Sequence, residues 1–303
     1  MTLPNSASRI PSPRIYRGRF APSPTGPLHF GSLVAAVGSW ARARSQNGAW
    51  IIRMEDLDPP REVPGAAADI IETLAAFGME SDEPVLYQSA RAPAYAAAFQ
   101  QLQQGNHLFP CWCSRSDLAA THGLHRGDCI AAPDPARAPA WRLRVPDRIV
   151  AFADLACGAQ AQNLRDAAGD FVIRRVEGWY AYQLAVVIDD AQQGISEVVR
   201  GVDLLDSTPR QIHLQQLLGL SMPTYLHLPL VLDGDGRKLS KSDRARPVER
   251  GEPLPALRAA LDFLGVDVRG AAGVHALLRQ AATQFEPTRL PKSAMPLPDL
   301  GRQ

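Results

Sequence analysis

The sequence predicts an α/β fold with a parallel sheet at its core, an inserted subdomain, and a short helical segment at the C-terminal end. Strand-like apolar runs alternate with segments of helical periodicity, which is typical of parallel sheets. The alternation stops between about residues 108 and 165, where cysteines and a Pro/Ala-rich run at 131–140 take its place. Helical periodicity returns after residue 251. In open parallel sheets, ligands bind at the carboxyl ends of the strands.

Individual elements are expected from local patterns. Strands are expected where β-branched and aromatic residues form short apolar runs, at 15–20, 49–54, 171–175, 181–188, 195–200 and 225–232. Helices are expected at residues 33–41 and onward to a C-cap at Gly48, and at 66–77, 92–103, 209–218 and 254–285. The fourth helix has Thr208 as its expected N-cap, Pro209 as its first residue and Gly219 as its stop.

These elements predict five segments along the chain. We expect a flexible tail at 1–14, the first half of the core at 15–107, the insertion at 108–165, the second half of the core at 166–250, and a helical segment at 251–303.

Of the 303 residues, 46% are hydrophobic and 21% charged, as in globular proteins. The net charge of +1 argues against indiscriminate nucleic-acid binding. No run of 18 apolar residues and no signal-like start occur, so we expect a cytoplasmic protein without a membrane span. We also expect a monomer, although no pattern in the sequence determines the oligomeric state.

Two short motifs far apart in the chain suggest phosphate chemistry. The stretch from Arg19 to Ser32 reads as a strand, a Pro/Gly-rich turn and a helix start, which offers backbone N–H groups and a positive helix end to an anion. Within it, His29 adds a donor and Gly31 permits close approach of a ligand. Lysine is rare in this arginine-rich chain, yet Lys238 and Lys241 stand three residues apart in one loop. Lysine is a compact point charge suited to following a phosphate through a reaction.

Three of the four cysteines are clustered in the predicted insertion. Cys111, Cys113 and Cys129, with His125 or His122 as a fourth ligand, suit a tetrahedral zinc site. Disulfides and free structural cysteines are the alternatives, and the lack of a secretory signal disfavours disulfides. Cys157 stands alone and is expected to be buried as a small apolar residue.

Together these motifs resemble those of the class I aminoacyl-tRNA synthetases, whose signatures are His-Ile-Gly-His and Lys-Met-Ser-Lys-Ser. The glutamyl branch is the most similar, because residues 19–26 read RFAPSPTG and residues 53–58 read RMEDLD. A third block runs from Tyr180 through Asp190 to Arg200 and residues 207–209. Ser32 and Leu239 depart from the signatures in ways that glutamyl enzymes tolerate. The resemblance implies a Rossmann-type nucleotide-binding core.

The resemblance also implies roles for individual residues. Glu55 would bind the ammonium of L-glutamate, and Arg19 and Arg200 its carboxylates; Tyr182, Ser23 and the neighbouring Phe20, Ala21 and Pro22 would complete the pocket. His29, Gly31 and Lys241 would bind ATP with Mg²⁺, and Lys238 would lie further from the reacting phosphate. In related enzymes a zinc site uses Cys-x-Cys and a later Tyr-x-x-x-Cys, so the resemblance favours His125 over His122.

The expected reaction depends on the length of chain after the second signature. Only about 60 residues come after Ser242, too few for the anticodon-binding domain of ordinary glutamyl-tRNA synthetases. The chain is therefore most similar to the short glutamyl-queuosine tRNA(Asp) synthetases, which activate glutamate without tRNA and transfer it to queuosine in the anticodon loop of tRNA(Asp). Two alternatives remain. One is a glutamyl-tRNA synthetase core that charges a tRNA 3′ end, and the other is an inactive paralogue that serves as a binding module.

Overall fold

The computed structural model describes residues 15–233, 236, 247–291 and 294–298. The strands are β1 (Arg17–Phe20), β2 (Ala49–Met54), β3 (Leu86–Tyr87), β4 (Leu108–Cys111), β5 (Ala140–Leu143), β6 (Ile149–Asp154), β7 (Gly158–Asn163), β8 (Phe171–Arg174), β9 (Glu197–Gly201), β10 (Thr224–Leu228), β11 (Val231–Leu232) and β12 (Met295–Pro296). The α-helices are α1 (Phe30–Ser45), α2 (Ala66–Ala76), α3 (Ala92–Gln104), α4 (Leu164–Ala167), α5 (Tyr182–Gln192), α6 (Thr208–Leu218), α7 (Pro253–Phe263) and α8 (Val274–Gln284).

The core is a parallel sheet, as the sequence predicts. Strands β1, β2 and β3 pair in parallel, and so do β9, β10 and β6, with β7 antiparallel at the edge. The two groups meet between β1 and β9, where the Ser196 amide donates to the Arg17 carbonyl at 3.0 Å. Helix α1 follows β1 directly, so the first turn of α1 lies at the carboxyl end of that strand.

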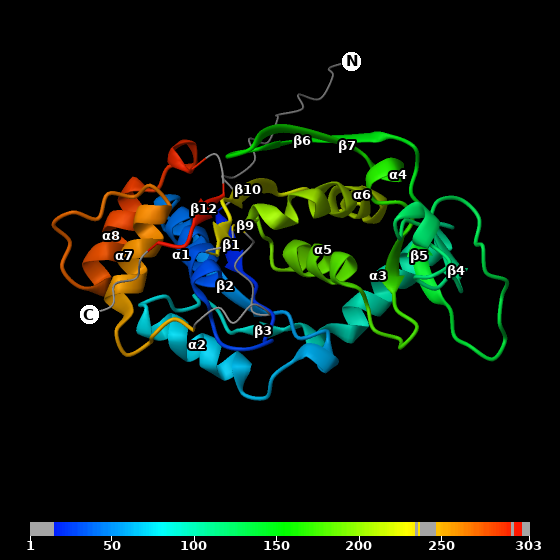
Figure 1. Cartoon of the computed structure of the whole chain (residues 1–303), viewed down its shortest axis with the longest axis horizontal. Helices are drawn as coiled ribbons and strands as arrows, with labels where there is room; N and C mark the ends of the chain where they lie inside the picture. Colours follow the sequence, from blue (N-terminus) through cyan, green and yellow to red (C-terminus); the bar gives the residue numbers. More distant parts are fainter. Residues whose placement is uncertain (1–14, 234–235, 237–246, 292–293, 299–303) are drawn as a thin grey trace, which may run out of the picture.

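A second sheet forms one end of the molecule. Strands β4, β5 and β8 pair antiparallel there, opposite the end formed by α7 and α8 (Figure 1). β6 and β7, which lie within the predicted insertion, join the core sheet instead. β8, which lies outside the predicted insertion, pairs with β5. The domain boundaries themselves remain a prediction.

Two hydrophobic clusters hold the elements together. One packs β1 and β2 against α1, α2, α7 and α8, and includes an edge-to-face contact between Phe30 and Phe263 at 6.4 Å between ring centroids. The other packs α3, α5 and α6 together. The helical stretch expected at 254–285 is two helices, since Gly265, Gly270 and Gly273 between them all take positive φ. Among the described residues, no helix is long and apolar enough to cross a membrane.

The strand predicted at 181–188 is wrong, because these residues begin helix α5. Every residue from Leu184 to Asp190 is buried, so the apolar run that predicted a strand is a helix enclosed on most sides. A short buried run does not distinguish the two structures by its periodicity. The strand predicted at 225–232 is divided into β10 and β11, with Pro229 between them.

Two predicted caps and one predicted burial are also corrected. Helix α1 ends at Ser45 with Gln46 as its C-cap. Gly48 is required for a different reason, since a Cβ there would lie 2.4 Å from the Tyr16 carbonyl oxygen. Thr208 is the first residue of α6 instead of its N-cap, and its hydroxyl contacts Arg200. Gly219 ends α6 in the left-handed conformation, as predicted. Cys157 is exposed, not buried.

Candidate active site

Two cavities lie side by side at the carboxyl ends of the core strands. Their volumes are about 800 and 700 Å³, and both are lined by residues 20, 21, 23 and 25 after β1. The larger cavity contains Arg19, Glu55, Tyr182 and Arg200, and the other contains Pro22, His29 and Gly31. The structure therefore brings four residues assigned to glutamate, Arg19, Glu55, Tyr182 and Arg200, into one cavity, and His29 and Gly31, assigned to ATP, into its neighbour. Pro22, also assigned to the glutamate pocket, lines only the second cavity. Lys238 and Lys241 lie outside the described residues.

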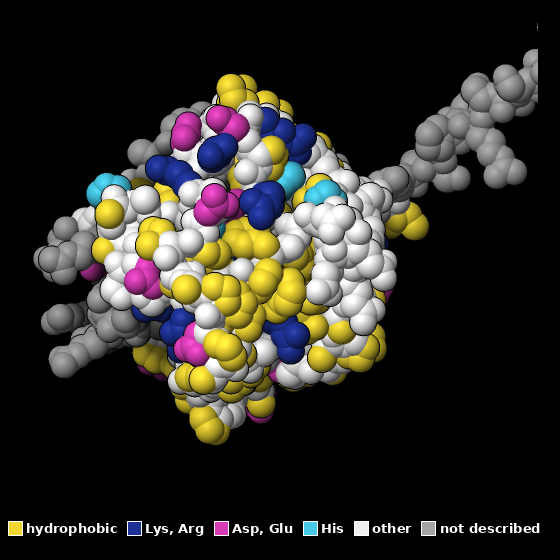
Figure 2. All heavy atoms as spheres, turned by 90° about the vertical axis from the view of Figure 1, so that its right-hand side faces the viewer, with side chains coloured by type: hydrophobic (Ala, Val, Ile, Leu, Met, Phe, Trp, Pro, Cys, Tyr) yellow, Lys and Arg dark blue, Asp and Glu magenta, His cyan; other side chains and the backbone are white. Residues whose placement is uncertain are grey.

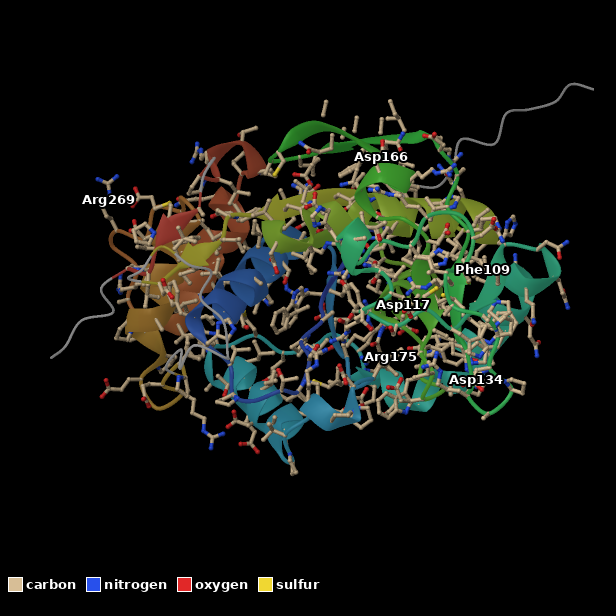
Figure 3. The ribbon with its side chains drawn as sticks, turned by 45° about the vertical axis from the view of Figure 1, so that its right-hand side comes forward. Phe109, Asp117, Asp134, Asp166, Arg175 and Arg269 are labelled. Atoms are coloured by element: carbon tan, nitrogen blue, oxygen red, sulfur yellow. The ribbon has the colours of Figure 1, made fainter. Side chains whose placement is uncertain are left out.

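The lining of the larger cavity includes Arg115 and Val172, which belong to the end of the molecule that carries β4 and β5. Arg175, just after β8, lines it and lies near the middle of the molecule in Figure 3, whereas Phe109 and Asp134 lie toward that end. Arg175 and Arg61 both contact the carboxylate of Asp58, at 3.7 and 2.6 Å. The charged side chains of Arg61 and Arg175 at this cavity are thus already paired with Asp58.

The wall of the larger cavity holds two buried arginines that share one carboxylate. Arg19 Nε lies 3.0 Å from Asp190 Oδ1, and Arg53 Nη1 lies 2.8 Å from the same oxygen. The Arg53 side chain is fully buried and that of Arg19 is 3% exposed. Burial opposes ionisation of Asp190, but both guanidinium groups outweigh it, so the pKa of this carboxyl is lowered. Asp190 therefore stays charged and fixes the position of Arg19.

Glu55 is the second acidic group in this wall. Its carboxylate lies 3.4 Å from Arg53 Nη2, and its side chain is 10% exposed. Burial raises the pKa of Glu55, while Arg53 and Arg19 partly oppose the increase. A carboxylate in this environment gains most from an additional cation, and the ammonium of an amino acid would supply one.

Arg200 differs from the other two buried arginines because all its partners are uncharged. It is 5% exposed and donates to His227, Gln211, Thr208 and the Leu204 carbonyl at 2.8–3.2 Å. No ion pair among the described residues includes it. Arg19 and Arg53 thus have Asp190 and Glu55 as carboxylate partners, whereas Arg200 contacts no carboxylate in the described chain. The guanidinium of Arg200 can therefore pair with an anionic ligand.

The hydroxyl of Tyr182 completes this wall. It lies 3.5 Å from Arg200 Nη1, at the limit of a hydrogen bond. Burial raises the pKa of Tyr182, although Arg200 opposes the shift, so the hydroxyl keeps its proton. Tyr182 can therefore donate to a ligand that binds in front of Arg200.

The second cavity is built on the first turn of α1. His29 is the N-cap residue, and its Nδ1 accepts from the Ser32 amide at 3.3 Å. The Ser32 hydroxyl lies 3.0 Å from His29 Nε2. Gly31 lines the cavity in this turn. A helix start with a histidine cap and a glycine beside open space is well suited to a phosphate group.

Some residues of the site could not be assigned from the sequence. Asp190, Gln211 and His227 contact the predicted arginines, but the sequence assigned a role to none of them, although Asp190 belongs to the third block of the resemblance. Asp190 gives the one available signal, since two aspartates interrupt an otherwise apolar run. Arg53 reads as a surface ion pair when taken alone, but it is among the largest fully buried side chains.

The predicted metal ligands come together in the subdomain around β4 and β5. The sulfur atoms of Cys111, Cys113 and Cys129 and one ring nitrogen of His125 all lie within 4.8 Å of one another. All four cysteines are free. His122, the alternative ligand, is exposed and not part of the cluster. This arrangement could hold a metal ion.

The surroundings of His125 fit a metal. Its Nε2 is buried without a hydrogen-bond partner, while its Nδ1 lies 2.9 Å from Asp170 Oδ2. A metal-bound imidazole commonly donates its other N–H to a carboxylate in this way. Arg142 Nε also lies 3.2 Å from Cys111 Sγ, so a cation lies beside this part of the cluster.

Comparisons with known proteins point to one family. The sequence family of tRNA synthetases class I (E and Q), catalytic domain, matches residues 16–271. The Glutamyl-Q tRNA(Asp) synthetase of Xanthomonas campestris pv. campestris (strain 8004) is 55% identical over 283 residues, which cover 92% of this chain and 94% of that protein. The protein of the same name from Burkholderia cenocepacia (strain J2315) is 54% identical over 274 residues, 86% of this chain and 92% of that protein.

A solved structure shares the fold. The glutamate tRNA ligase of Elizabethkingia meningosepticum, solved with its amino acid, superimposes with a TM-score of 0.78. At 24% sequence identity it covers 93% of this chain and 67% of that protein.

Proposed function

Because the chain belongs to the class I tRNA synthetases of the E and Q type, we propose that it activates L-glutamate with ATP and transfers it to queuosine in the anticodon loop of tRNA(Asp). The observation that carries the choice of amino acid is the excess positive charge at Arg200 beside Arg19 and Glu55. Glutamate has one net negative charge, which balances that excess. The choice of acceptor rests on the names of the relatives.

In the first step a glutamate carboxylate oxygen attacks the α-phosphorus of ATP. The bond to the β-phosphate oxygen breaks, and pyrophosphate leaves to give glutamyl-adenylate. Negative charge accumulates around phosphorus in such a reaction, so preplaced donors contribute most. The α1 N-terminus with His29 and Gly31 would supply donors, and Lys241, which lies outside the described residues, would supply others. Mg²⁺ would be held mainly by the phosphates and water.

In the second step the acceptor group of queuosine attacks the carbonyl carbon of the adenylate, and AMP leaves. The decisive measurement is ATP–pyrophosphate exchange with and without tRNA, followed by transfer to tRNA(Asp). We expect exchange with glutamate in the absence of tRNA. We expect transfer that needs queuosine and survives removal of the 3′-terminal adenosine. If removal of that adenosine abolished transfer, the chain would be a glutamyl-tRNA synthetase core. If no ATP–pyrophosphate exchange occurred at all, it would be an inactive paralogue.

We propose that the Cys₃His cluster holds one structural zinc. Four protein ligands would leave no open position on the metal, so it would stabilise the subdomain without taking part in the reaction. The free Nε2 of His125 and the three nearby sulfur atoms support this assignment.

The zinc site gives a prediction that does not depend on catalysis. Cys113→Ser should lower zinc content below about one ion per chain and destabilise the subdomain, while glutamate activation persists. Asp170→Asn should retain the four ligands but release zinc to a chelator at about 10- to 100-fold lower chelator concentration. Metal analysis and chelator titration measure both effects. Absence of zinc from wild-type protein purified without chelator would contradict the assignment.

An exposed group of arginines is the best candidate for contacting the RNA backbone. Arg126, Arg144, Arg148 and Arg165 line a cavity of about 610 Å³ between the β4–β5 subdomain and α6. None takes part in an ion pair within the described chain. Figure 2 looks onto this end of the molecule, where most of the Lys, Arg and His side chains lie in the upper half, with Asp and Glu side chains among them, above a central hydrophobic group. Arg144 stacks over Phe109 with 4.7 Å from its guanidinium carbon to the ring centroid.

Replacing two of these arginines should weaken tRNA binding without affecting the first step. Each lost phosphate contact reduces the slope of log K against log salt by about 0.7–0.9. Arg144→Gln with Arg165→Gln should therefore lower the slope by up to about 1.8, while exchange with glutamate is unchanged. Arg279→Gln, which removes an exposed arginine from α8 at the opposite end, is the control. Equal slopes for the double variant and the control would contradict the assignment.

A further inference from the structure

A buried chain of hydrogen bonds joins Arg200 to a carboxylate that lies outside both cavity linings. Arg200 Nε is 3.1 Å from His227 Nε2, and His227 Nδ1 is 2.6 Å from Asp154 Oδ2. His227 is 1% exposed and Asp154 is 4% exposed. The three residues come from β9, β10 and β6, so neighbouring core strands carry the whole chain.

The chemistry of arginine decides how His227 is protonated. A guanidinium has only N–H donors, so His227 Nε2 must accept and cannot carry a proton. The ring proton is therefore on Nδ1 and is donated to Asp154. Burial lowers the pKa of His227 and the charge of Arg200 lowers it further, despite the opposing effect of Asp154. His227 is neutral in this arrangement.

Asp154 is anchored by the backbone. Its Oδ1 accepts from the amides of Ala156 and Cys157 at 3.0 and 2.8 Å, and its Oδ2 accepts from the His227 amide at 3.1 Å. Burial opposes the charged form, but these donors and the His227 ring lower the pKa of Asp154. The carboxylate thus stays ionised and holds the imidazole in one tautomer and one orientation.

The remaining nitrogens of Arg200 show what this orientation achieves. Nη2 donates to the Leu204 carbonyl and the Thr208 hydroxyl, and Nη1 donates to Gln211 Oε1 at 2.8 Å. The weakest contact, from Nη1 to the Tyr182 hydroxyl at 3.5 Å, is on the cavity side. The guanidinium is therefore held by neutral acceptors and presents an Nη1 hydrogen to the cavity with its charge uncompensated.

We propose that His227 and Asp154 are positioning residues that orient Arg200 for the glutamate carboxylate while leaving its positive charge available. A carboxylate in place of His227 would also orient Arg200, but it would neutralise the charge that the substrate needs. The neutral imidazole of His227 orients Arg200 without neutralising its charge. The inference rests on the proposed function in one respect, that the carboxylate bound by Arg200 belongs to glutamate.

Two substitutions at one position test the proposal. His227→Asn keeps a donor near the position of Nδ1, for Asp154, but removes the acceptor for Arg200. His227→Gln places an amide oxygen near the position of Nε2 and so keeps that acceptor. Loss of a charged hydrogen bond predicts a KM for glutamate raised about 10- to 100-fold in His227→Asn. We expect His227→Gln to retain most of the wild-type affinity. The KM for ATP should change little in both.

The control variant is His213→Gln, which removes another buried histidine, outside both active-site cavities. It should leave the KM for glutamate unchanged. Melting temperatures of all variants separate a folding defect from a local one. The proposal would be overturned if the KM for glutamate rose equally in His227→Asn and His227→Gln, or if both variants kept the wild-type KM. If wild-type protein shows no glutamate-dependent exchange, the proposed function fails instead.

Discussion

Arg200→Ala should reduce glutamate activation by about 30-fold to several thousand-fold, because it removes a buried charge that the substrate carboxylate needs. Loss of one partner of a buried charge pair costs about 2–5 kcal/mol. Arg200 also donates hydrogen bonds to His227, Gln211 and Thr208, and the substitution removes all three. Pyrophosphate exchange at varied glutamate concentrations measures the effect.

The same variant tests selection against glutamine. Glutamine is nearly the same shape as glutamate, so charge must separate them, and a neutral amide leaves the excess positive charge of the site unpaired. Arg200→Ala should therefore reduce the ratio of glutamate activation to glutamine activation. Arg200→Lys should not restore activity fully, because a single ammonium nitrogen cannot reproduce the planar guanidinium, which reaches its partners through three separate nitrogens. Equal activation of glutamine and glutamate by wild-type protein would show that the pocket is wrongly assigned.

Asp190→Asn should lower the free energy of unfolding by about 3–5 kcal/mol, because it leaves two buried guanidinium groups without their shared carboxylate. Arg19 should also lose its fixed position, so the KM for glutamate should rise. Urea denaturation and exchange kinetics measure the two effects. Since the pKa of Asp190 is lowered in the folded state, its contribution is full above the ordinary Asp pKa of about 3.9 and is lost as the pH falls through the folded-state pKa.

Glu83→Gln provides a matched control for Asp190→Asn. It also changes a carboxylate to an amide within an arginine pair, but Glu83 is 45% exposed and its partner Arg17 is 27% exposed. Exposed ion pairs contribute about 0–1 kcal/mol. If Asp190→Asn destabilises the protein no more than Glu83→Gln does, the shared carboxylate is not what stabilises the two arginines.

The difference between predicted and observed elements has a clear physical origin. Most helices and strands were predictable because periodicity and turn residues act locally, as at Gly219, which ends α6 in the conformation that glycine favours. The strand prediction at 181–188 was wrong because these residues lie in helix α5, which is buried around most of its surface. Such a helix lacks the polar face that would distinguish its sequence from that of a strand. The Cys₃His cluster was predictable because thiolates and imidazole at that spacing suit a metal site.

By itself, the sequence determined the α/β class, the anion-binding turn with His29 and the clustered cysteines, because these depend on residue types at fixed spacing. The resemblance to the glutamyl synthetases added the choice of His125 and the pocket residues Arg19, Glu55, Tyr182 and Arg200. Only the tertiary structure decided that Asp190 neutralises Arg19 and Arg53 and that Arg200 is held by neutral groups. Charge balance depends on which side chains share a buried volume, and residues 154, 200 and 227 meet there only because β6, β9 and β10 are neighbours in the sheet.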